Sequence, residues 1–226
     1  MLARVANRLS ELVEDIHSVN VDVDNRRELL TLQIVDRNRT LHPARALSDG
    51  TLRFLALSIL ELDTSAHGLL CFEEPENGIH PERIPSMLRL LKDLATDTDE
   101  EVGKDNPLRQ VIVNTHSPTV VGLVYDADLL VAEPCEVSVN GRRCRAVSFS
   151  WLEGTWRQDM KPEERTLARG KLRFYLNPLA VAENMEDEPP EDAVTQQKTT
   201  RRKPRRVKDR SDLQLFLPNI PWSEDE

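Results

Sequence analysis

The sequence predicts an α/β protein with a parallel sheet, flanking helices and a charged C-terminal tail. Three observations lead to this fold class. Short apolar runs in residues 69–72, 110–113 and 126–134 each end in polar residues. Apolar residues at helical spacing separate these runs, and from about Glu183 apolar residues become rare. Strands that alternate with helices are typical of parallel sheets with crossover connections.

Length and composition set the limits of this fold. The chain has 226 residues, enough for one core of roughly 150–200 residues plus a tail. The net charge of −9 provides no chain-wide positive field for nucleic acid. No apolar run approaches the roughly 20 residues of a membrane-spanning helix, so no membrane partner is expected. Three cysteines without a CxxC pair indicate a reducing, cytoplasmic location, and we expect Cys71 to be buried.

The N-terminal third predicts a helix, a hairpin and a second helix. Apolar residues from Leu2 to Ile16 recur at three and four positions, which indicates one apolar stripe on a helix. Two strand-like runs, 19–24 and 28–36, flank a polar turn and favour a hairpin. Ser48 is a typical helix cap, and the apolar residues that follow it to Leu62 predict a helix buried nearly all round.

The middle of the chain predicts the parallel sheet. Residues 69–72 read as a buried strand that ends in two carboxylates, residues 81–95 as a helix and residues 110–113 as the next strand. Further on, residues 145–151 predict a strand and residues 162–176 a short helix. The resulting domains are a folded α/β lobe at 1–182 and a disordered charged tail at 183–226.

Three segments form a candidate phosphate site. Ser48, Asp49 and Gly50 begin a helix, whose free N–H groups favour anions. Glu73 and Glu74 end one strand, and His116 follows the next, so all three are expected at the carboxyl edge of the sheet.

The residue types of these segments suit phosphoryl transfer to water. One carboxylate could hold Mg²⁺ and the other could orient or deprotonate water, while a histidine could bond a terminal phosphate. Taken singly, each segment has an ordinary explanation: a helix cap, a solvated acidic face and a structural histidine. Their joint occurrence in this order favours function.

These segments resemble the ABC-type ATPases of the SMC, RecF and OLD-like (AAA_21-like) branch over approximately residues 19–133. LSDGTLRFLAL resembles the signature motif, LLCFEEPENGIHP the Walker B strand with the D-loop, and VNTHSP the switch histidine. The resemblance implies a partial P-loop NTPase fold of the ABC type, with residues 1–182 as the C-terminal lobe of the ATPase domain. It also implies ATP and Mg²⁺ as cofactors. It assigns catalysis to Glu74 and His116 and the metal to Glu73. It implies that Ser48, Asp49 and Gly50 contact ATP held by a second protomer. It also counts Asn77 and Gly78 as cofactor-binding residues, in the D-loop that communicates across the dimer.

The sequence departs from that family at three points. Glu73 replaces the usual aspartate, and Asp49 stands where many relatives have glycine. The third departure is that no GxxxxGK[ST] phosphate loop is found among the eight glycines. Three explanations fit this absence: a fragment, a lobe on a separate polypeptide, or a degenerate relative. The retained acids and histidine favour the first two, and hence a chain inactive alone.

Two functions follow from the resemblance. The first is ATP binding and hydrolysis in a dimer, coupled to DNA repair or phage defence, with the Walker A lobe supplied from elsewhere. The alternative is a regulatory or DNA-binding module that does not hydrolyse ATP. A basic cluster in residues 201–210 offers a possible DNA contact, although a solubilising tail that pairs with nearby acids explains it equally well.

Overall fold

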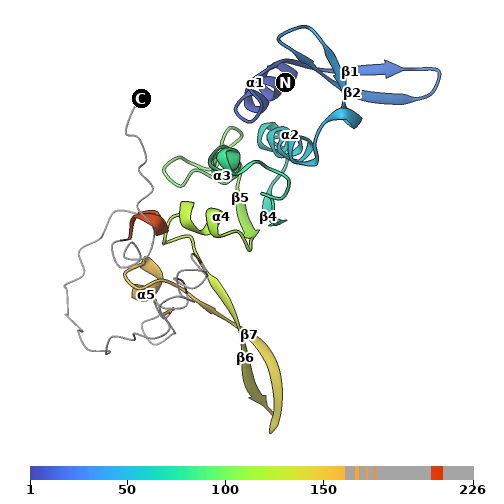
Figure 1. The fold of residues 1–226 in the computed structure, drawn as a ribbon. Helices are drawn as coiled ribbons and strands as arrows, with labels where there is room; N and C mark the ends of the chain where they lie inside the picture. Colours follow the sequence, from blue (N-terminus) through green and yellow to red (C-terminus); the bar gives the residue numbers. More distant parts are fainter. Residues whose placement is uncertain (161–165, 168–171, 173–175, 177–204, 211–226) are drawn as a thin grey trace, which may run out of the picture. The chain divides into compact units, whose positions relative to one another are not determined.

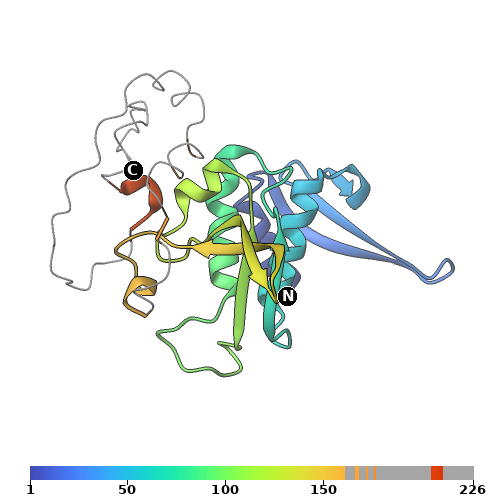
Figure 2. The same cartoon turned by 90° about the horizontal axis from the view of Figure 1, so that it is seen from below.

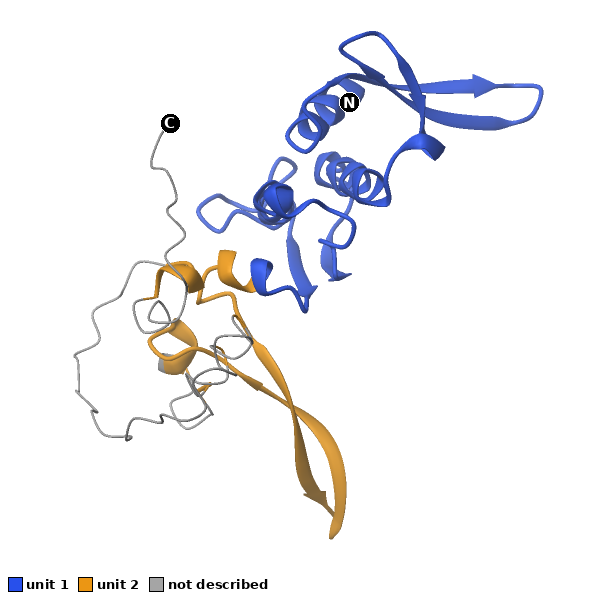
Figure 3. Cartoon of the chain, viewed as in Figure 1, with its two compact units in different colours: residues 1–120 blue, residues 121–226 orange. Residues whose placement is uncertain are grey.

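The computed structural model describes residues 1–160, 166–167, 172, 176 and 205–210. The chain divides into two compact units, residues 1–120 and 121–226 (Figure 3). Helix α4 (Pro118–Leu123) contains the boundary between them. The fold class is α/β, with a parallel strand pair and flanking helices as predicted.

Three helices build the core of unit 1 (Figure 1). They are α1 (Leu2–Ser10), α2 (Asp49–Leu62) and α3 (Ile84–Leu94), and α2 contacts the other two. Their apolar spacing predicted all three helices. The first helix is shorter than predicted, because α1 ends at Ser10 and Ile16, the last residue of the predicted stripe, begins a strand. Leu9, Phe54 and Met87 are among the most deeply buried side chains. The prediction that α2 is buried nearly all round is wrong, since Ile59 is 38% exposed.

The predicted hairpin is present and is longer than expected. β1 (Ile16–Asp24) pairs antiparallel with β2 (Leu29–Asp36), and a short β3 (Leu41–Pro43) adds to β2, followed by the 3₁₀ turn η1 (Ala44–Ala46). Val19 and Ile34 pair at the base of the hairpin and are buried. Its far end extends away from the helices of unit 1 in both views (Figures 1 and 2).

The parallel sheet consists of β4 (Gly68–Glu73) and β5 (Arg109–Asn114). The crossover between them contains α3, which is preceded by the 3₁₀ turn η2 (Pro81–Arg83). Side chains alternate across a strand, so the two strands present one covered and one open face. Leu69, Cys71 and Ile112 are exposed on the open face.

Two burial predictions for β4 are therefore wrong. The strand was expected to be buried, yet Leu69 is 56% exposed, and Cys71 is exposed rather than buried. The physical reason is that burial of a parallel strand needs elements over both faces of the sheet. The described residues cover one face only.

Unit 2 is built around an antiparallel hairpin and a small core. β6 (Val131–Val139) pairs with β7 (Arg142–Ser150), and α5 (Trp156–Met160) follows. Residues 126–134 were expected to give a third parallel strand, so that prediction is wrong in partner and direction. The strand predicted at 145–151 is confirmed as the second half of β7. Val121, Leu152, Leu167, Leu172 and Val207 form the core.

Part of the predicted tail packs on unit 2. Residues 205–210, which include the 3₁₀ turn η3 (Val207–Asp209), lie along residues 124–126. Val207 donates its N–H to Val124 O at 3.0 Å, and Asp126 donates its N–H to Arg205 O at 2.9 Å. Asp126 is buried and pairs with Arg205 and Arg210 at 3.2 and 3.4 Å.

The expectation of disorder is therefore not met at residues 205–210. Most of the helix predicted at 162–176 and the rest of the tail lie outside the described residues. Among the helices that the structure describes, none has the length and hydropathy to span a bilayer.

Candidate functional site

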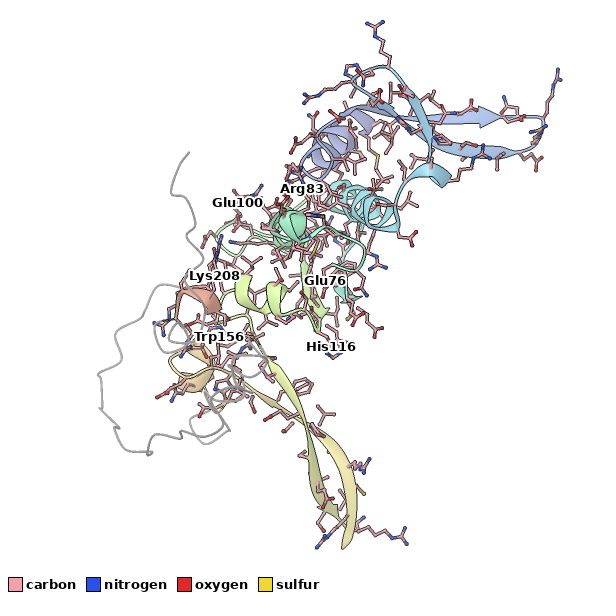
Figure 4. All side chains as sticks on the ribbon, in the orientation of Figure 1. Glu76, Arg83, Glu100, His116, Trp156 and Lys208 are labelled. Carbon is pink, nitrogen blue, oxygen red and sulfur yellow. The ribbon has the colours of Figure 1, made fainter. Side chains whose placement is uncertain are left out.

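The acids and the histidine lie at one edge of the β4–β5 sheet. Glu73 pairs in register with Asn114, and the next residue, Glu74, donates its backbone N–H to Asn114 O at 2.8 Å. His116 follows two residues later, in the turn before α4 (Figure 4). The parallel register places these strand ends side by side because both strands run in the same direction. This part of the predicted arrangement is confirmed.

Glu73 and Glu74 have different surroundings. Glu73 is exposed at the end of the open face, whereas Glu74 is half-buried and accepts a hydrogen bond from Asn77 Nδ2 at its Oε2, at 2.6 Å. The φ angle of Glu74 is +43°, in the left-handed region that non-glycine residues rarely occupy. Such a conformation costs on the order of 1–3 kcal/mol and persists only where neighbouring contacts impose it.

Contacts from α2 and from the loop itself hold Glu74. Arg53 Nη1 donates to Glu74 O at 2.8 Å, and Asn77 donates its N–H to the same carbonyl at 3.1 Å. Ile79 closes the next turn by donating to Glu76 O at 3.0 Å. The loop at 74–80, the acidic loop, therefore has a defined backbone.

The start of α2 touches the acidic loop directly. A Cβ atom placed on Gly50 would lie 2.2 Å from Gly78 O, so the two backbones approach more closely than any side chain would permit. Gly78 itself has a φ of +81°, where glycine is favoured. Both glycines that the resemblance assigned to ATP contact thus have a structural role in this loop pairing.

Ser48 and Asp49 are exposed at the N-terminus of α2. Ser48 Oγ accepts the Thr51 N–H at 3.1 Å and lies 2.8 Å from Thr51 Oγ1, which confirms it as the helix cap. A 14-residue helix brings partial positive charge to this end. Capping and an outward-facing hydroxyl are compatible, because a serine oxygen has two acceptor lone pairs and one donor.

Sequence reasoning missed Arg53 and Glu76. Glu76 is buried in the acidic loop, and its Oε1 accepts a hydrogen bond from Thr115 Oγ1. Arg53 is on the polar side of α2, where charged residues are common and do not indicate a function. The local sequence shows Glu76 only as an acid between Pro75 and a loop glycine. Solvent-exposed turns commonly have the same sequence pattern. Both roles depend on contacts between segments distant in the sequence.

The donor set suits Mg²⁺ in part. Glu73 offers an exposed carboxylate, and Mg²⁺ is commonly held by one or two carboxylates together with phosphate and water oxygens. In the described ranges of the chain, no three acids, histidines or cysteines gather as a ready-made metal cage. Residues present thus fit an ion that a nucleotide brings with it.

Comparisons with known proteins bear on this site. Residues 4–122 match the family described as "AAA domain, putative AbiEii toxin, Type IV TA system". No curated protein matches the chain. Among solved structures, one reported under "Structural biochemistry of ATP-driven dimerization and DNA stimulated activation of SMC ATPases" is 13% identical, with a TM-score of 0.41. The alignment covers 74% of this chain and 92% of the other.

Proposed function

Since the chain belongs to the AAA_21 family of AAA-type ATPase domains, we propose that it binds and hydrolyses ATP together with a Walker A lobe supplied from elsewhere. One observation carries this proposal. The helix start at Ser48, the acidic loop and the turn of His116 are joined by short contacts, Gly50 to Gly78 and Glu74 to Asn114. Phosphoryl transfer needs such joint positioning more than it needs covalent chemistry.

Each residue takes one role in this proposal. Ser48, Asp49 and Gly50 face the terminal phosphate of an ATP molecule held by a second protomer, with Asn77 and Gly78 beside them. Glu73 would hold Mg²⁺, which supplies charge neutralisation on the phosphates. Glu74 orients or deprotonates the attacking water, and His116 donates a hydrogen bond to the phosphate.

The open face of the β4–β5 sheet supports the need for a further lobe. Leu69 is 56% exposed and Ile112 is 49% exposed, and Cys71 lies between them in the pleat. Parallel sheets are ordinarily covered on both faces. The sequence also contains no GxxxxGK[ST] loop. A lobe that brings this loop and covers the open face would meet both needs.

The wider role of ATP turnover is proposed from the description of the family. The description of the family names a toxin of a toxin–antitoxin system, which favours phage defence over DNA repair as the process that ATP turnover serves. Fewer residues of the basic cluster are proposed to contact DNA, because Arg205 and Arg210 are paired with Asp126. We retain Arg201, Arg202 and Lys203 as its proposed centre. A cytoplasmic location remains part of the proposal.

The isolated chain should not bind ATP tightly. We expect calorimetric titration of Mg·ATP into the full chain to give no binding in the micromolar range, because the loop that holds the β- and γ-phosphates is not in the sequence. Micromolar affinity for the chain alone would show that the nucleotide is held in another way and would overturn the proposed division of labour.

Hydrolysis should depend on Glu74 once the Walker A lobe is present. With a polypeptide that carries the phosphate loop, we expect Glu74→Gln to lower kcat about 10²–10⁴-fold, the usual range for loss of a general base. Glu101→Gln, an exposed acid in the loop before β5, is the matched control and should leave kcat unchanged. Equal turnover by the two variants would show that Glu74 is not the catalytic base, whereas no turnover by the wild-type complex would favour the non-hydrolysing module.

A further inference from the structure

Glu76 is a buried acid for which the proposed catalytic roles leave no task. It is 8% exposed, and Pro75 and Ile79 beside it in the acidic loop are buried too. Its Oε1 accepts the Thr115 hydroxyl. Its Oε2 is buried and has no hydrogen-bond partner within the described residues. Figure 4 shows Glu76 in the loop after β4 and His116 in the turn after β5.

Such a carboxylate is costly for a protein that only needs to fold. Burial of a charged or polar group is unfavourable unless hydrogen bonds replace its water. Glu76 has one such bond and one oxygen without any. An apolar side chain of similar size would fill the same space at lower cost. The bond that Glu76 does make is therefore the feature that needs an explanation.

Thr115, which donates the bond to Glu76, shapes the turn that carries His116. Thr115 Oγ1 donates to Glu76 and also accepts the Ser117 N–H at 3.0 Å. These two bonds span His116, whose own side chain is exposed. Ser117 Oγ in turn accepts the Val120 N–H at 3.4 Å, in the first turn of α4. Loss of the Glu76 contact would free the Thr115 hydroxyl to rotate and would loosen this turn.

We propose that Glu76 is a positioning residue: through the Thr115 hydroxyl it fixes the turn 115–117 and thereby holds His116 in place relative to the acidic loop. The role of this contact in catalysis rests on the proposed function, whereas the contact itself can be tested without nucleotide. Movement of the acidic loop, for example when a second protomer binds, would be transmitted to His116 through the same two bonds. The bond from the Val120 N–H to Ser117 Oγ would carry it on to the start of α4.

The test measures the turn directly in the full chain. NMR would follow amide hydrogen exchange at Ser117 and the ring signals of His116, assigned with His116→Gln. Thr115→Val keeps the shape but lacks the hydroxyl, and Glu76→Ala removes the acceptor. We expect each to speed Ser117 exchange about 2- to 10-fold, the range for one hydrogen bond, and to shift the same His116 signals. The double variant should show no further change, since both substitutions break one contact.

Conservative variants and a matched control separate positioning from general loss of stability. Thr115→Ser retains the hydroxyl and Glu76→Gln retains an acceptor oxygen, so both should keep the wild-type signals. Thr96→Val removes a comparable half-buried hydroxyl, which bonds to Pro107 O and Arg109 O at the other end of β5. It should leave the His116 ring unchanged even if it destabilises the fold.

Two outcomes overturn the proposal. One is an unchanged His116 ring and Ser117 exchange rate in Glu76→Ala while Thr115→Val alters both. The other is additive effects in the double variant, because additivity means that the two residues act separately. Failure of the ATPase experiments would leave these readouts unaffected, so the two proposals can fail independently. Should Glu76→Ala not fold, comparison of Thr115→Val with Thr115→Ser still decides whether the hydroxyl holds the turn.

Discussion

Gly50 sets the distance between the helix start and the acidic loop. A Cβ there would meet the backbone of Gly78 at 2.2 Å, and backbone atoms cannot move aside as the end of a flexible side chain can. We expect Gly50→Ala to lower the free energy of unfolding by about 1–3 kcal/mol, as other overpacked sites do. Urea unfolding of the full chain, followed by circular dichroism, would measure this.

Gly122 in α4 provides the control for that substitution. It is also helical, but an added Cβ would have open space within 4 Å. Gly122→Ala should therefore be neutral or stabilising by about 0.5–1 kcal/mol, as expected for alanine in a helix. If Gly50→Ala were as harmless as Gly122→Ala, the close contact between α2 and the acidic loop would not exist in solution.

At the scale of single residues, the sequence predicted the places of the candidate residues in helices and strands better than it predicted their contacts. Ser48 was expected to cap a helix and does so, and Glu73, Glu74 and His116 were expected at strand ends and lie there. Their catalytic and binding roles stay predictions. Arg53 and Glu76 were missed because their partners, Glu74 and Thr115, are 21 and 39 positions away. No local pattern carries that information.

Among the elements, the turn that joins β2 to β3 depends on a charged side chain. Asp36 accepts the Thr40 N–H at 2.8 Å and lies 3.1 Å from His42 Nε2. The hydrogen bond from His42, followed by that from Thr40, holds the pKa of Asp36 below its ordinary value. Its ionised form is therefore favoured in the folded chain more than in the unfolded one.

The sign of the resulting pH dependence follows from linkage. Because the pKa of Asp36 is lower in the folded chain, its contribution to the stability of the fold is fully present above the unfolded pKa of about 3.9. That contribution is lost as the pH falls through the folded pKa. We expect wild type to be more stable than Asp36→Asn at pH 6, with the difference shrinking below about pH 4. Urea unfolding across pH 3–7 would show this, with Asp22→Asn on β1 as control. A difference that grows on acidification would contradict the assignment.

Helices and strands with a clear spacing of apolar residues were predictable from the sequence, whereas the elements that pair with them or cover them were not. The spacing of α1 and α3, the apolar run of β4 and the β-branched run of β5 predicted the correct type of element. Burial of Cys71 and the parallel direction assumed for β6 were wrong. Periodicity reports which side of an element is apolar, but it does not report which element covers that side. This depends on the whole set of segments that compete for it.

For the whole molecule, residues 205–210 pack within unit 2 against residues that lie far from them along the chain. Val207 is fully buried in the core with Val121 and Leu152, more than 80 positions from Val121. Tyr125 and Arg206 form an antiparallel bridge beside it, and Asp126 pairs with Arg205 and Arg210. Charge density alone suggested a separate tail here. Val207 is the one apolar residue in 205–210, and it is the residue of this segment that enters the core.

Val207→Ala tests whether this segment is an integral part of unit 2. Loss of a buried valine side chain beyond Cβ, with the cavity it leaves, should lower the stability of unit 2 by about 1–3 kcal/mol. Hydrogen exchange by mass spectrometry would detect this as faster exchange in peptides from residues 121–126 and 150–160. Val139→Ala, a 53% exposed site on β6, should change stability by less than about 0.5 kcal/mol.

Because unit 1 has its own core, its peptides should exchange at the wild-type rate in both variants. Equal acceleration in unit 1 would mean that the units unfold together, and no acceleration in unit 2 would mean that Val207 is not packed in its core.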